Sequence, residues 1–514
     1  MPFVLFFLLF LCYLVSGYGV LTLFGMRLKT AYMITLSLLL GVAIASMLPF
    51  LMQLFYIPLT PASVFGSLFG MALLLNIPTI RRIRKEGFTA IRKTFAMRPF
   101  RILSAELPFL AIFAFLVFVS VWRCYYLPPT SRDALSGPEA IADVAVREHT
   151  MINSFFNIDL WSTNNQFKSP FLISLQMICK MAGFPFGQVW LSIVFISFTV
   201  FLYHAMKEKI HPIIAGLLLL LFLMTPEMYA YTFMILYDYS NMIFFFLSLY
   251  FLFDYFRNKI PAHFYFAGLL MGIATYIRSE TLVLAFLFLP PILLTQIRGR
   301  EPVKKIALAN LFFFLPSLLG YYLTSQLYIK YYLPVHYDIG SLINNHLSDL
   351  HPLFQRYTDI VTHLVASEFG IHLWGYLFYI TAFLFLAEGL FRGRYNKDAR
   401  NWLYAILALY IGIGALGFAL PMMNLNETTK RALFKLLPLA VLYLANNNLL
   451  IRLSQWISRW EGAPLAFTLI GKRSTASASA RPAADRPAPG KSATQGKSAA
   501  PAGKSRSSKK RRNK

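Results

Sequence analysis

Long apolar stretches alternate with short polar connections along most of this chain of 514 residues. A helix needs about 20 apolar residues to cross a membrane, and stretches such as 213–224, 244–256 and 308–323 reach that length with their flanks. The pattern predicts an all-α polytopic integral membrane protein with about thirteen spanning helices. The predicted spans cover residues 2–25, 31–55, 61–80, 103–124, 187–206, 211–226, 240–257, 263–278, 280–297, 303–325, 371–391, 402–420 and 431–450.

Composition supports the membrane class and argues against a soluble domain. Hydrophobic residues make up 57% of the chain and charged residues 14%, whereas a soluble domain of this length needs far more polar surface. The first residues, MPFVLFFLLFLCYLV, lack the basic start and the small-residue cleavage site of a signal peptide, so we interpret them as a retained span. Three cysteines without a CxxC spacing predict neither a disulfide framework nor a zinc site.

Basic residues gather in short connections, and the positive-inside rule assigns such connections to the cytoplasm. With thirteen spans, every basic connection falls on one side, the amino terminus lies outside and the carboxyl terminus lies in the cytoplasm. Lys430 and Arg431 are the one basic step that this topology leaves outside. The predicted cytoplasmic connections are 27–29, 81–101, 207–209, 257–259, 298–305, 392–400 and 452–459.

Two predicted outside loops are long, at residues 125–186 and 326–370, and they are able to form a modest cap over the membrane. Within the first loop, 170–183 is apolar but too short to span, which favours a juxtamembrane helix that lies along the interface or re-enters it. The second loop lacks the HxH, HxxxH and HExxH spacings of a metal site, so a cap that grips the acceptor or a lipid headgroup is our interpretation. Its histidines and acids are His336, His346, His351, His363, Asp338 and Asp349.

Composition divides the chain into four regions. Residues 1–102 hold three N-terminal spans and a basic connection, and residues 103–450 hold the remaining spans and both long loops. We expect an interfacial segment at 451–470. Residues 471–514 carry 13 Lys and Arg against one acid, which predicts a disordered cytoplasmic tail attracted to anionic lipid headgroups. A tail that is simply solvated is the alternative, and no specific nucleic-acid partner is expected.

Ionisable residues near the predicted outside ends of the spans are the candidates for chemistry. Asp133 follows the fourth span closely, where a carboxylate stays ionised and can act as a general base. Lys168 opens the short apolar segment, which places its ammonium at the depth of a lipid phosphate. Arg278, Lys430 and Arg431 cap later spans and together can frame one anion site. Transfer of a sugar from a lipid phosphate needs such a base for the acceptor proton and such cations for the leaving phosphate.

The order of these motifs resembles the GT-C glycosyltransferases, polytopic enzymes that use polyprenyl-phosphate sugars, and most closely the lipid A aminoarabinose transferases and protein O-mannosyltransferases. Asp133 in SRDALSGPEA is similar to their acidic motif after an early span, and KSPF from Lys168 resembles their KPPL or HPPL motif. YDYSNMIFFF is similar to a span that starts with an acid, here Asp238. GLLMGIATYIRSETLVL resembles a small-residue span ending in a basic-acidic turn, and KRALFKLLPLAVLYL resembles an Arg-aromatic-Leu-Leu-Pro span.

The resemblance covers about residues 103–450 and departs from the family at three places. Ser169 replaces the first proline of KPPL, Ala432 replaces an aromatic residue, and the paired acids of the family read Asp-Ala. The second acid must therefore come from elsewhere in the chain. The candidates are Glu139, Asp143 and Asp238.

The resemblance implies single, inverting transfer of a sugar from a polyprenyl-phosphate carrier to an envelope lipid, glycan or protein acceptor, at the periplasmic or extracellular face. It implies that Asp133 acts as the base and that the donor phosphate is bound by Lys168, Arg278, Lys430 and Arg431. No cofactor is assigned, and a divalent metal stays open. The alternatives are a polysaccharide polymerase or ligase that uses lipid-linked sugars, a polytopic transporter, and a scaffold that recruits partners through the tail.

Each candidate residue also has an ordinary structural interpretation. Asp133 fits a solvated loop residue, and Lys168 fits an interfacial anchor. Asp238 fits a helix cap at the start of its span. Arg278 fits an ion pair with Glu280 in a turn, and the basic pair at 430–431 fits an anchor for a helix end. That pair violates both the positive-inside rule and the preference of a helix start for acids, which favours a functional role.

Overall fold

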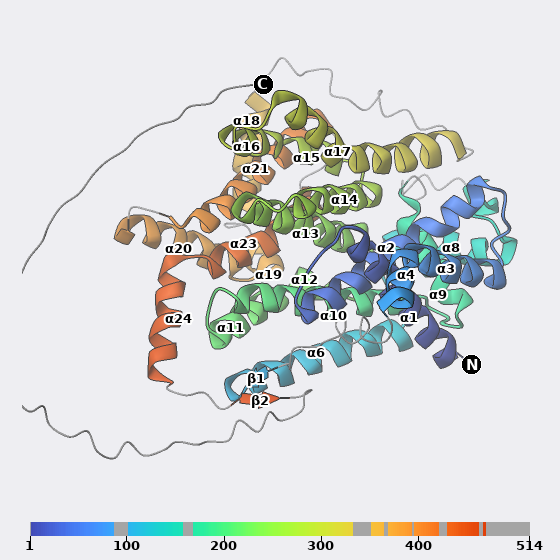
Figure 1. The fold of residues 1–514 in the computed structure, drawn as a ribbon, viewed down its shortest axis with the longest axis horizontal. Helices are drawn as coiled ribbons and strands as arrows, with labels where there is room; N and C mark the ends of the chain where they lie inside the picture. The colour runs from blue at the N-terminus through green and yellow to red at the C-terminus, as the bar shows by residue number, and fades with distance from the viewer. Residues whose placement is uncertain are drawn as a thin grey trace, which may run out of the picture. The chain divides into compact units, whose positions relative to one another are not determined.

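The computed structural model describes residues 2–86, 101–157, 168–332, 351–363, 368–392, 395–420, 429–461 and 466–468, and most of these residues are helical (Figure 1). Residues 1–471 form one packed unit, and residues 472–514 are separate from it. The predicted disordered tail therefore lies outside the described residues, as do His336, Asp338, His346 and Asp349 of the second long loop.

The helices in chain order are α1 (Pro2–Leu23), α2 (Thr30–Leu54), α3 (Pro61–Leu75), α4 (Ile77–Glu86), α6 (Leu107–Tyr126), α7 (Arg132–Leu135), α8 (Pro138–Glu148), α9 (Pro170–Met181), α10 (Val189–Lys207), α11 (Pro212–Leu223), α12 (Pro226–Ala230), α13 (Tyr237–Asn258), α14 (Pro261–Ile277), α15 (Thr281–Phe286), α16 (Leu289–Arg298), α17 (Val303–Tyr321), η4 (Tyr322–Tyr332), α18 (His351–Val361), α19 (Glu368–Trp374), α20 (Leu377–Arg392), α21 (Lys397–Ala419), α22 (Lys430–Leu433), α23 (Leu436–Ala445) and α24 (Asn448–Trp460). Short 3-10 turns occur at η1 (Ser104–Glu106) and η2 (Ser154–Asn157).

Eight segments among the described residues are helices long and apolar enough to cross a membrane. Two further pairs pass the same test together but are bent, by 52° between α3 and α4 and by 53° between the helix Lys430–Ala445 and α24. These helices confirm an all-α, multi-pass membrane protein, while the count of thirteen spans stays a prediction. The eight segments are Val4–Leu23, Thr30–Leu54, Ser104–Tyr126, Val189–Lys207, Tyr237–Asn258, Thr281–Arg298, Val303–Lys330 and Lys397–Ala419.

Three predicted spans correspond to shorter helices in the structure. The prediction 211–226 corresponds to α11 with 12 residues, 263–278 to α14 with 17, and 371–391 to α20 with 16. Helices of this length extend about 18–25 Å, which is less than the ~30 Å hydrocarbon core of a bilayer. Neighbouring segments must therefore complete any crossing that these helices begin.

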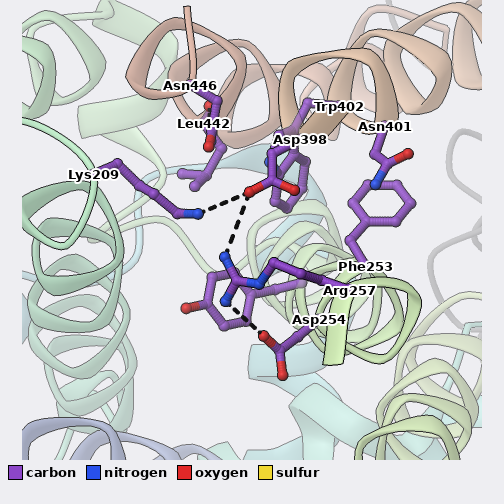
Figure 2. A pocket seen from close by; sticks show the side chains of 10 residues that line it. Lys209, Phe253, Asp254, Arg257, Asp398, Asn401, Trp402, Leu442 and Asn446 are labelled. Atoms are coloured by element: carbon purple, nitrogen blue, oxygen red, sulfur yellow. Dashed lines mark hydrogen bonds and ion pairs between the residues drawn. The ribbon is translucent and has the colours of Figure 1, made fainter. Parts of the chain in front are cut away.

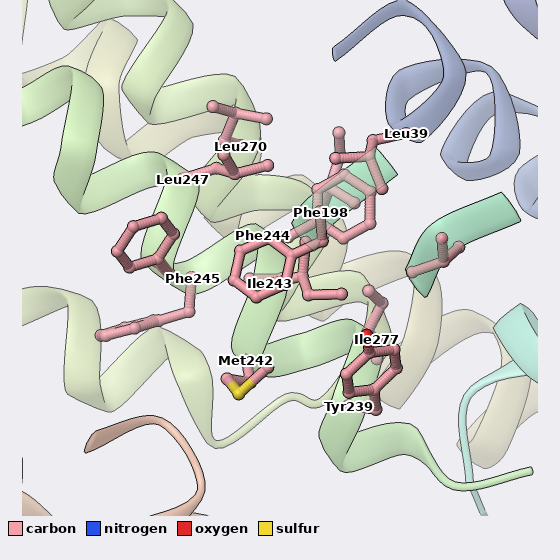
Figure 3. Packing of buried hydrophobic residues seen from close by; sticks show 14 of the residues in the cluster. Leu39, Phe198, Tyr239, Met242, Ile243, Phe244, Phe245, Leu247, Leu270 and Ile277 are labelled. Carbon is pink, nitrogen blue, oxygen red and sulfur yellow. The ribbon is translucent and has the colours of Figure 1, made fainter. Parts of the chain in front are cut away.

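The centre of the helical unit is built around α13, which is buried along its whole first half, from Tyr237 to Leu249. Leu39 of α2, Phe198 of α10 and Leu270 of α14 approach it from different helices (Figure 3). Aromatic side chains fill this region, and Phe198 lies edge-on against Phe246 with ring centroids 5.6 Å apart. The high phenylalanine content of the chain is thus used in packing between helices as well as toward lipid.

The N-terminal helices belong to the same core as the region 103–450. Most of α2 is buried, and it packs against α1, α9 and α10. Its backbone comes so close to α1 that a Cβ built on Gly41 would lie 1.9 Å from the carbonyl oxygen of Tyr13. Helices α1 and α2 are therefore packed into the same core as helices of the region 103–450.

Helices α14 and α17 run side by side in the same direction, joined through small residues. A Cβ on Gly268 would lie 2.6 Å from the carbonyl oxygen of Phe313, and one on Gly272 would lie 2.5 Å from Cβ of Pro316. A Cβ on Gly320 would in turn lie 2.5 Å from the carbonyl oxygen of Gly272. Glycine is required here because helix backbones approach this closely in membrane proteins only across small residues.

Four of the connections predicted to be cytoplasmic meet at one end of the unit, which we call the basic end. Asp398, at the start of α21, accepts hydrogen bonds from Lys209 at 2.9 Å and from Arg257 at 3.4 Å (Figure 2). Arg257 also pairs with Asp254 at 2.9 Å. Lys29 pairs with Glu208 at 2.7 Å at the same group of connections. These ion pairs thus join four connections that are far apart in sequence, as expected when the helices between them run in alternating directions.

Two elements differ from the sequence prediction. Besides helices, the structure has one two-stranded antiparallel sheet, in which β1 (Arg101–Leu103) pairs with β2 (Ala466–Thr468). The segment expected along the membrane interface, 170–183, forms α9, whose residues Pro170 to Cys179 are all buried against other helices, including α2 and α8. The protein itself therefore covers this short apolar helix on all sides.

Candidate functional site

Seven charged residues come together at the end of the unit formed by the predicted outside connections. They are supplied by five separate parts of the chain, and several form ion pairs across the gaps between helices. We call this group the charge cluster. Its members are Asp133, Lys168, Asp238, Arg278, Glu280, Arg431 and Lys435.

Asp133 lies on the short helix α7, nine residues beyond the end of the predicted fourth span at residue 124. Ser131 begins this helix, because its hydroxyl accepts a hydrogen bond from the backbone N–H of Ala134 at 3.2 Å. The Asp133 carboxylate accepts a hydrogen bond from the guanidinium of Arg431, which lies 298 residues later in the chain. This pair connects the first long loop to the start of the last predicted span.

Asp238 and Arg278 form the buried part of the charge cluster. Asp238 lies in the first turn of α13 with 2% of its surface exposed, and its carboxylate pairs with the guanidinium of Arg278. Arg278 follows the last residue of α14 and also pairs with Glu280 at 2.5 Å, so one guanidinium holds two carboxylates. The Asn241 amide fixes the turn, because it donates to the Ala274 carbonyl at 2.7 Å and to the Thr281 hydroxyl at 2.9 Å.

Lys168 interacts electrostatically with both ion pairs, Asp133–Arg431 and Asp238–Arg278. Its ammonium is 5.9 Å from the centre of the Tyr237 ring, and the Tyr237 hydroxyl donates a hydrogen bond of 2.7 Å to the carbonyl of Ser169. Burial lowers the pKa of Lys168 to about 8, although attraction to Asp133 and Asp238 acts in the opposite direction. A lysine with this pKa is still mainly protonated at pH 7, and it is less hydrated than a surface lysine.

A cavity of about 340 Å³ opens beside Asp133 and Arg431. Glu227, on α12, and Lys430 form an ion pair of 2.5 Å on its wall. Tyr231 lines the cavity and stacks on Phe434, with ring centroids 4.4 Å apart. The volume is in the range of small-molecule sites, and the wall combines charged, aromatic and apolar groups. Its lining residues are Ser131, Arg132, Asp133, Glu227, Tyr231, Met234, Leu236, Lys430 and Arg431.

The structure brings most of the predicted site residues to this place. Asp133, Asp238, Lys168, Arg278 and Arg431 are in the charge cluster, joined by ion pairs or by electrostatic interaction. Lys430, the remaining candidate for binding the phosphate, lies on the cavity wall and forms an ion pair with Glu227.

Glu139 and Asp143, the other candidates for the second acid, have different partners. Both lie on α8 and pair with Lys180 of α9, at 2.6 and 2.8 Å. Gln176 also donates to Glu139 at 2.6 Å. Burial raises the pKa of Glu139 above its usual value, and the ion pair with Lys180 offsets only part of this rise. These contacts hold α8 against α9, so of the three candidates only Asp238 shares the charge cluster with Asp133.

Two residues of the site were missed by the sequence analysis. Lys435 is 1% exposed, and its position inside an apolar predicted span was the available signal, because ionisable residues in such spans are expensive and commonly functional. Glu227 sits in a short predicted connection and has no sequence pattern that marks it. Only the folding of α12 against α11 and α19 places its carboxylate at the cavity, where it pairs with Lys430.

The described donors do not fit a metal site. No group of three or more His, Cys, Asp or Glu side chains comes together among the described residues. Asp133 and Asp238 each have an arginine as partner, and a further metal cation would compete with it. In the second long loop, His351 begins α18, whereas the buried His363 interacts electrostatically with Lys430. The divalent metal left open by the resemblance thus has no set of ligands in this part of the chain.

Comparisons with protein-family models, with curated proteins and with solved structures find no match for this chain.

Proposed function

We propose that the protein is a membrane glycosyltransferase that moves a sugar from a polyprenyl-phosphate carrier to an envelope lipid, glycan or protein acceptor. The observation that supports this most is the charge cluster beside the 340 Å³ cavity. It combines carboxylates and cations at helix ends, where a lipid headgroup would lie. In the proposed topology this end faces the periplasm or the extracellular space, the amino terminus is on the same side and the tail is cytoplasmic.

The cations of the cluster bind the donor phosphate in this proposal. Lys168 contributes an ammonium that has lost part of its hydration, so its attraction to an anion is stronger than in water. Arg278 and Arg431 contribute guanidinium groups, whose planar N–H donors suit phosphate oxygens. Both arginines are already held by carboxylates, so the phosphate meets donors that are in place before it binds. The prenyl chain then extends between helices toward lipid.

Asp133 removes the acceptor proton in this proposal. It is the one carboxylate that belongs both to the charge cluster and to the cavity wall, and its side chain is 24% exposed. Asp238 has 2% exposure and is better suited to positioning Arg278 than to contacting an acceptor. The acceptor oxygen attacks the anomeric carbon, the bond from that carbon to the phosphate oxygen breaks, and the proton passes to Asp133. One displacement inverts the anomeric configuration.

The place of the cluster favours transfer over transport. A secondary transporter binds its substrate near the membrane midplane, at interrupted helices of paired repeats. Here the charged residues lie at the first turn of α13, directly after α14 and at the start of α22, which are helix ends. A polysaccharide polymerase or ligase uses related donors at the same face, and the chemical nature of the product distinguishes it from the proposed enzyme.

Mass spectrometry of envelope lipids and glycans tests the proposal. Cells without the active gene should lack a sugar-modified product, and a wild-type copy should restore it. A copy with Asp133→Asn should insert into the membrane but restore about 10²–10⁴-fold less product, because the general base is lost. Asp143→Asn is the matched control, since that acid lies on α8 and pairs with Lys180.

The outcomes separate the alternatives. An envelope of unchanged composition in cells without the gene contradicts the proposed transferase. Full restoration of the product by Asp133→Asn would show that Asp133 is not the base, but it would not contradict sugar transfer by this protein. A change in polymer length without a missing sugar favours the polymerase or ligase.

A further inference from the structure

Lys435 is a buried lysine that has no hydrogen-bond partner in the part of the chain that the structure describes. It is 1% exposed, between α22 and α23, in a segment that is otherwise apolar. Among the described residues, no hydrogen-bond acceptor lies within reach of its Nζ atom. Burial of an ammonium without a hydrogen bond is costly, so buried lysines normally have a partner. Packing alone does not explain a lysine here, because a leucine or methionine would fill the same space.

The surroundings of Lys435 point to the charge cluster. Lys435 lies four residues after Arg431, in the turn that joins α22 to α23. Both cations interact electrostatically with Asp238. Lys435 is also attracted to Glu280 and repelled by Arg278. Its buried side chain therefore lies near the carboxylates Asp238 and Glu280 of the cluster.

We propose that Lys435 is a further phosphate-binding residue, which contacts the phosphate of the lipid carrier and neutralises the second negative charge that appears on it during transfer. The inference rests on the proposed function. A sugar linked to a prenyl phosphate is a phosphodiester with one negative charge. When the bond from the anomeric carbon to oxygen breaks, its electron pair stays on the phosphate oxygen, and the product is a phosphomonoester with two charges near neutral pH.

The charges of the cluster balance in both states when Lys435 is included. Before transfer, three carboxylates face four cations, and the excess positive charge matches the phosphodiester. After transfer, Asp133 holds the acceptor proton, so two carboxylates face four cations and the excess of two matches the phosphomonoester. Without Lys435, one negative charge would stay uncompensated in a buried place.

Binding of farnesyl phosphate and of its methyl diester to the full-length protein in lipid nanodiscs tests this inference. Farnesyl phosphate carries two charges and the diester one. Lys435→Met should weaken binding of farnesyl phosphate about tenfold or more, because a hydrogen bond between charged groups is lost. Binding of the diester should weaken less, and Lys435→Arg should retain most of the preference for farnesyl phosphate. Lys209→Met, at the basic end, is the matched control and should bind both compounds as the wild type does.

The result also separates this inference from the proposed function. If the wild type binds farnesyl phosphate and Lys435→Met binds it equally well, the role of Lys435 is wrong and the proposed function stands. If the wild type binds neither compound, the proposed function is wrong and the role of Lys435 falls with it. An equal loss for both compounds in a folded variant contradicts the second-charge argument. Helical circular dichroism and elution as a single species verify folding.

Discussion

At the scale of residues, the site depends on how each charge is held. Arg278 binds two carboxylates, Asp238 and Glu280, and stays in one place because both pairs are present. Lys168 is positioned through its neighbours, since the Tyr237 hydroxyl binds the carbonyl of Ser169. Buried charges of this kind destabilise a fold when a partner is removed, so we expect them to be retained for binding or catalysis.

The lowered pKa of Lys168 predicts how ligand binding depends on pH. A lysine loses its charge above its pKa, and burial has brought this pKa down to about 8. Affinity for farnesyl phosphate should therefore fall as the pH rises from 7.5 through 8 and above. The ligand does not change its own charge in this range, because its second pKa is about 6.

Titration of binding from pH 7.5 to 9.5 measures this effect, with Lys168→Arg as the matched variant. Arginine stays protonated over the whole range, so the fall should be shallower in Lys168→Arg than in the wild type. Parallel curves for the two proteins contradict a contact between Lys168 and the phosphate.

At the scale of elements, the position of Arg278 depends on how closely α14 and α17 pack. Gly272 and Gly320 allow the two backbones to touch one turn or two before Arg278. The hydroxyl of Thr324 also donates to the carbonyl of Tyr276 at 2.8 Å, which extends the contact to the end of α14. The close packing that these small residues allow therefore determines the position of Arg278 in the charge cluster.

Gly272→Ala should push α14 and α17 apart. The new Cβ would lie 2.5 Å from Cβ of Pro316 and 2.7 Å from its carbonyl oxygen, and neither atom belongs to a flexible side-chain end. We expect a loss of about 1–3 kcal/mol in stability, seen as a lower thermal midpoint in detergent, together with weaker ligand binding.

Gly66→Ala is the control for that substitution, since nothing lies within 4 Å of a Cβ at this position on α3. Its thermal midpoint should equal that of the wild type or exceed it slightly, because alanine favours a helix more than glycine does. Equal effects of the two substitutions would show that close packing at Gly272 does not matter.

At the scale of the whole molecule, two groups of connections lie at opposite ends of the helices. Lys29, Lys209, Arg257 and Asp398 belong to the basic end. The charge cluster belongs to the other end, since α13 runs from Asp238 to Asn258 and α14 returns to Arg278. The positive-inside rule then predicts that the basic end faces the cytoplasm.

Cysteine labelling of intact cells measures this sidedness. In a protein without its three native cysteines, Arg147→Cys on α8 should react with a membrane-impermeant maleimide, since this position is exposed and belongs to the first long loop. Lys304→Cys, exposed at the start of α17, should react only after the cells are permeabilised. The reverse pattern would place the cluster in the cytoplasm and contradict the use of a carrier at the outer face.

Removal of residues 472–514 tests whether the tail takes part in the reaction. Residues 1–471 form a packed unit of their own, and the charge cluster lies entirely within it. The shortened protein should therefore insert into the membrane and restore the envelope product in cells without the gene. Loss of the product despite normal insertion favours a scaffold that acts through the tail.

Much of the fold was predictable from the sequence, because spans are marked by long local runs of apolar residues. The turn between α14 and α15, expected at Arg278–Glu280, falls at these residues. Lengths were less predictable, as α11 shows: this helix ends at Leu223, and the extended Thr225 before Pro226 separates it from α12. The buried position of α9 was also not predictable, since a short apolar segment fits an interface equally well.

The sequence by itself determined the membrane class, the order of the helices and the charged residues worth considering, because each depends on composition within a short window. Tertiary structure alone decided which charges meet. Arg431 reaches Asp133 across 298 residues, and Glu139, which is close to Asp133 in sequence, turns to Lys180 instead. The role proposed for the buried Lys435 depends on its electrostatic interaction with Asp238, which the sequence does not reveal. Electrostatic partners are set by distance in space, and the packing of α13, α14 and α22 determines that distance.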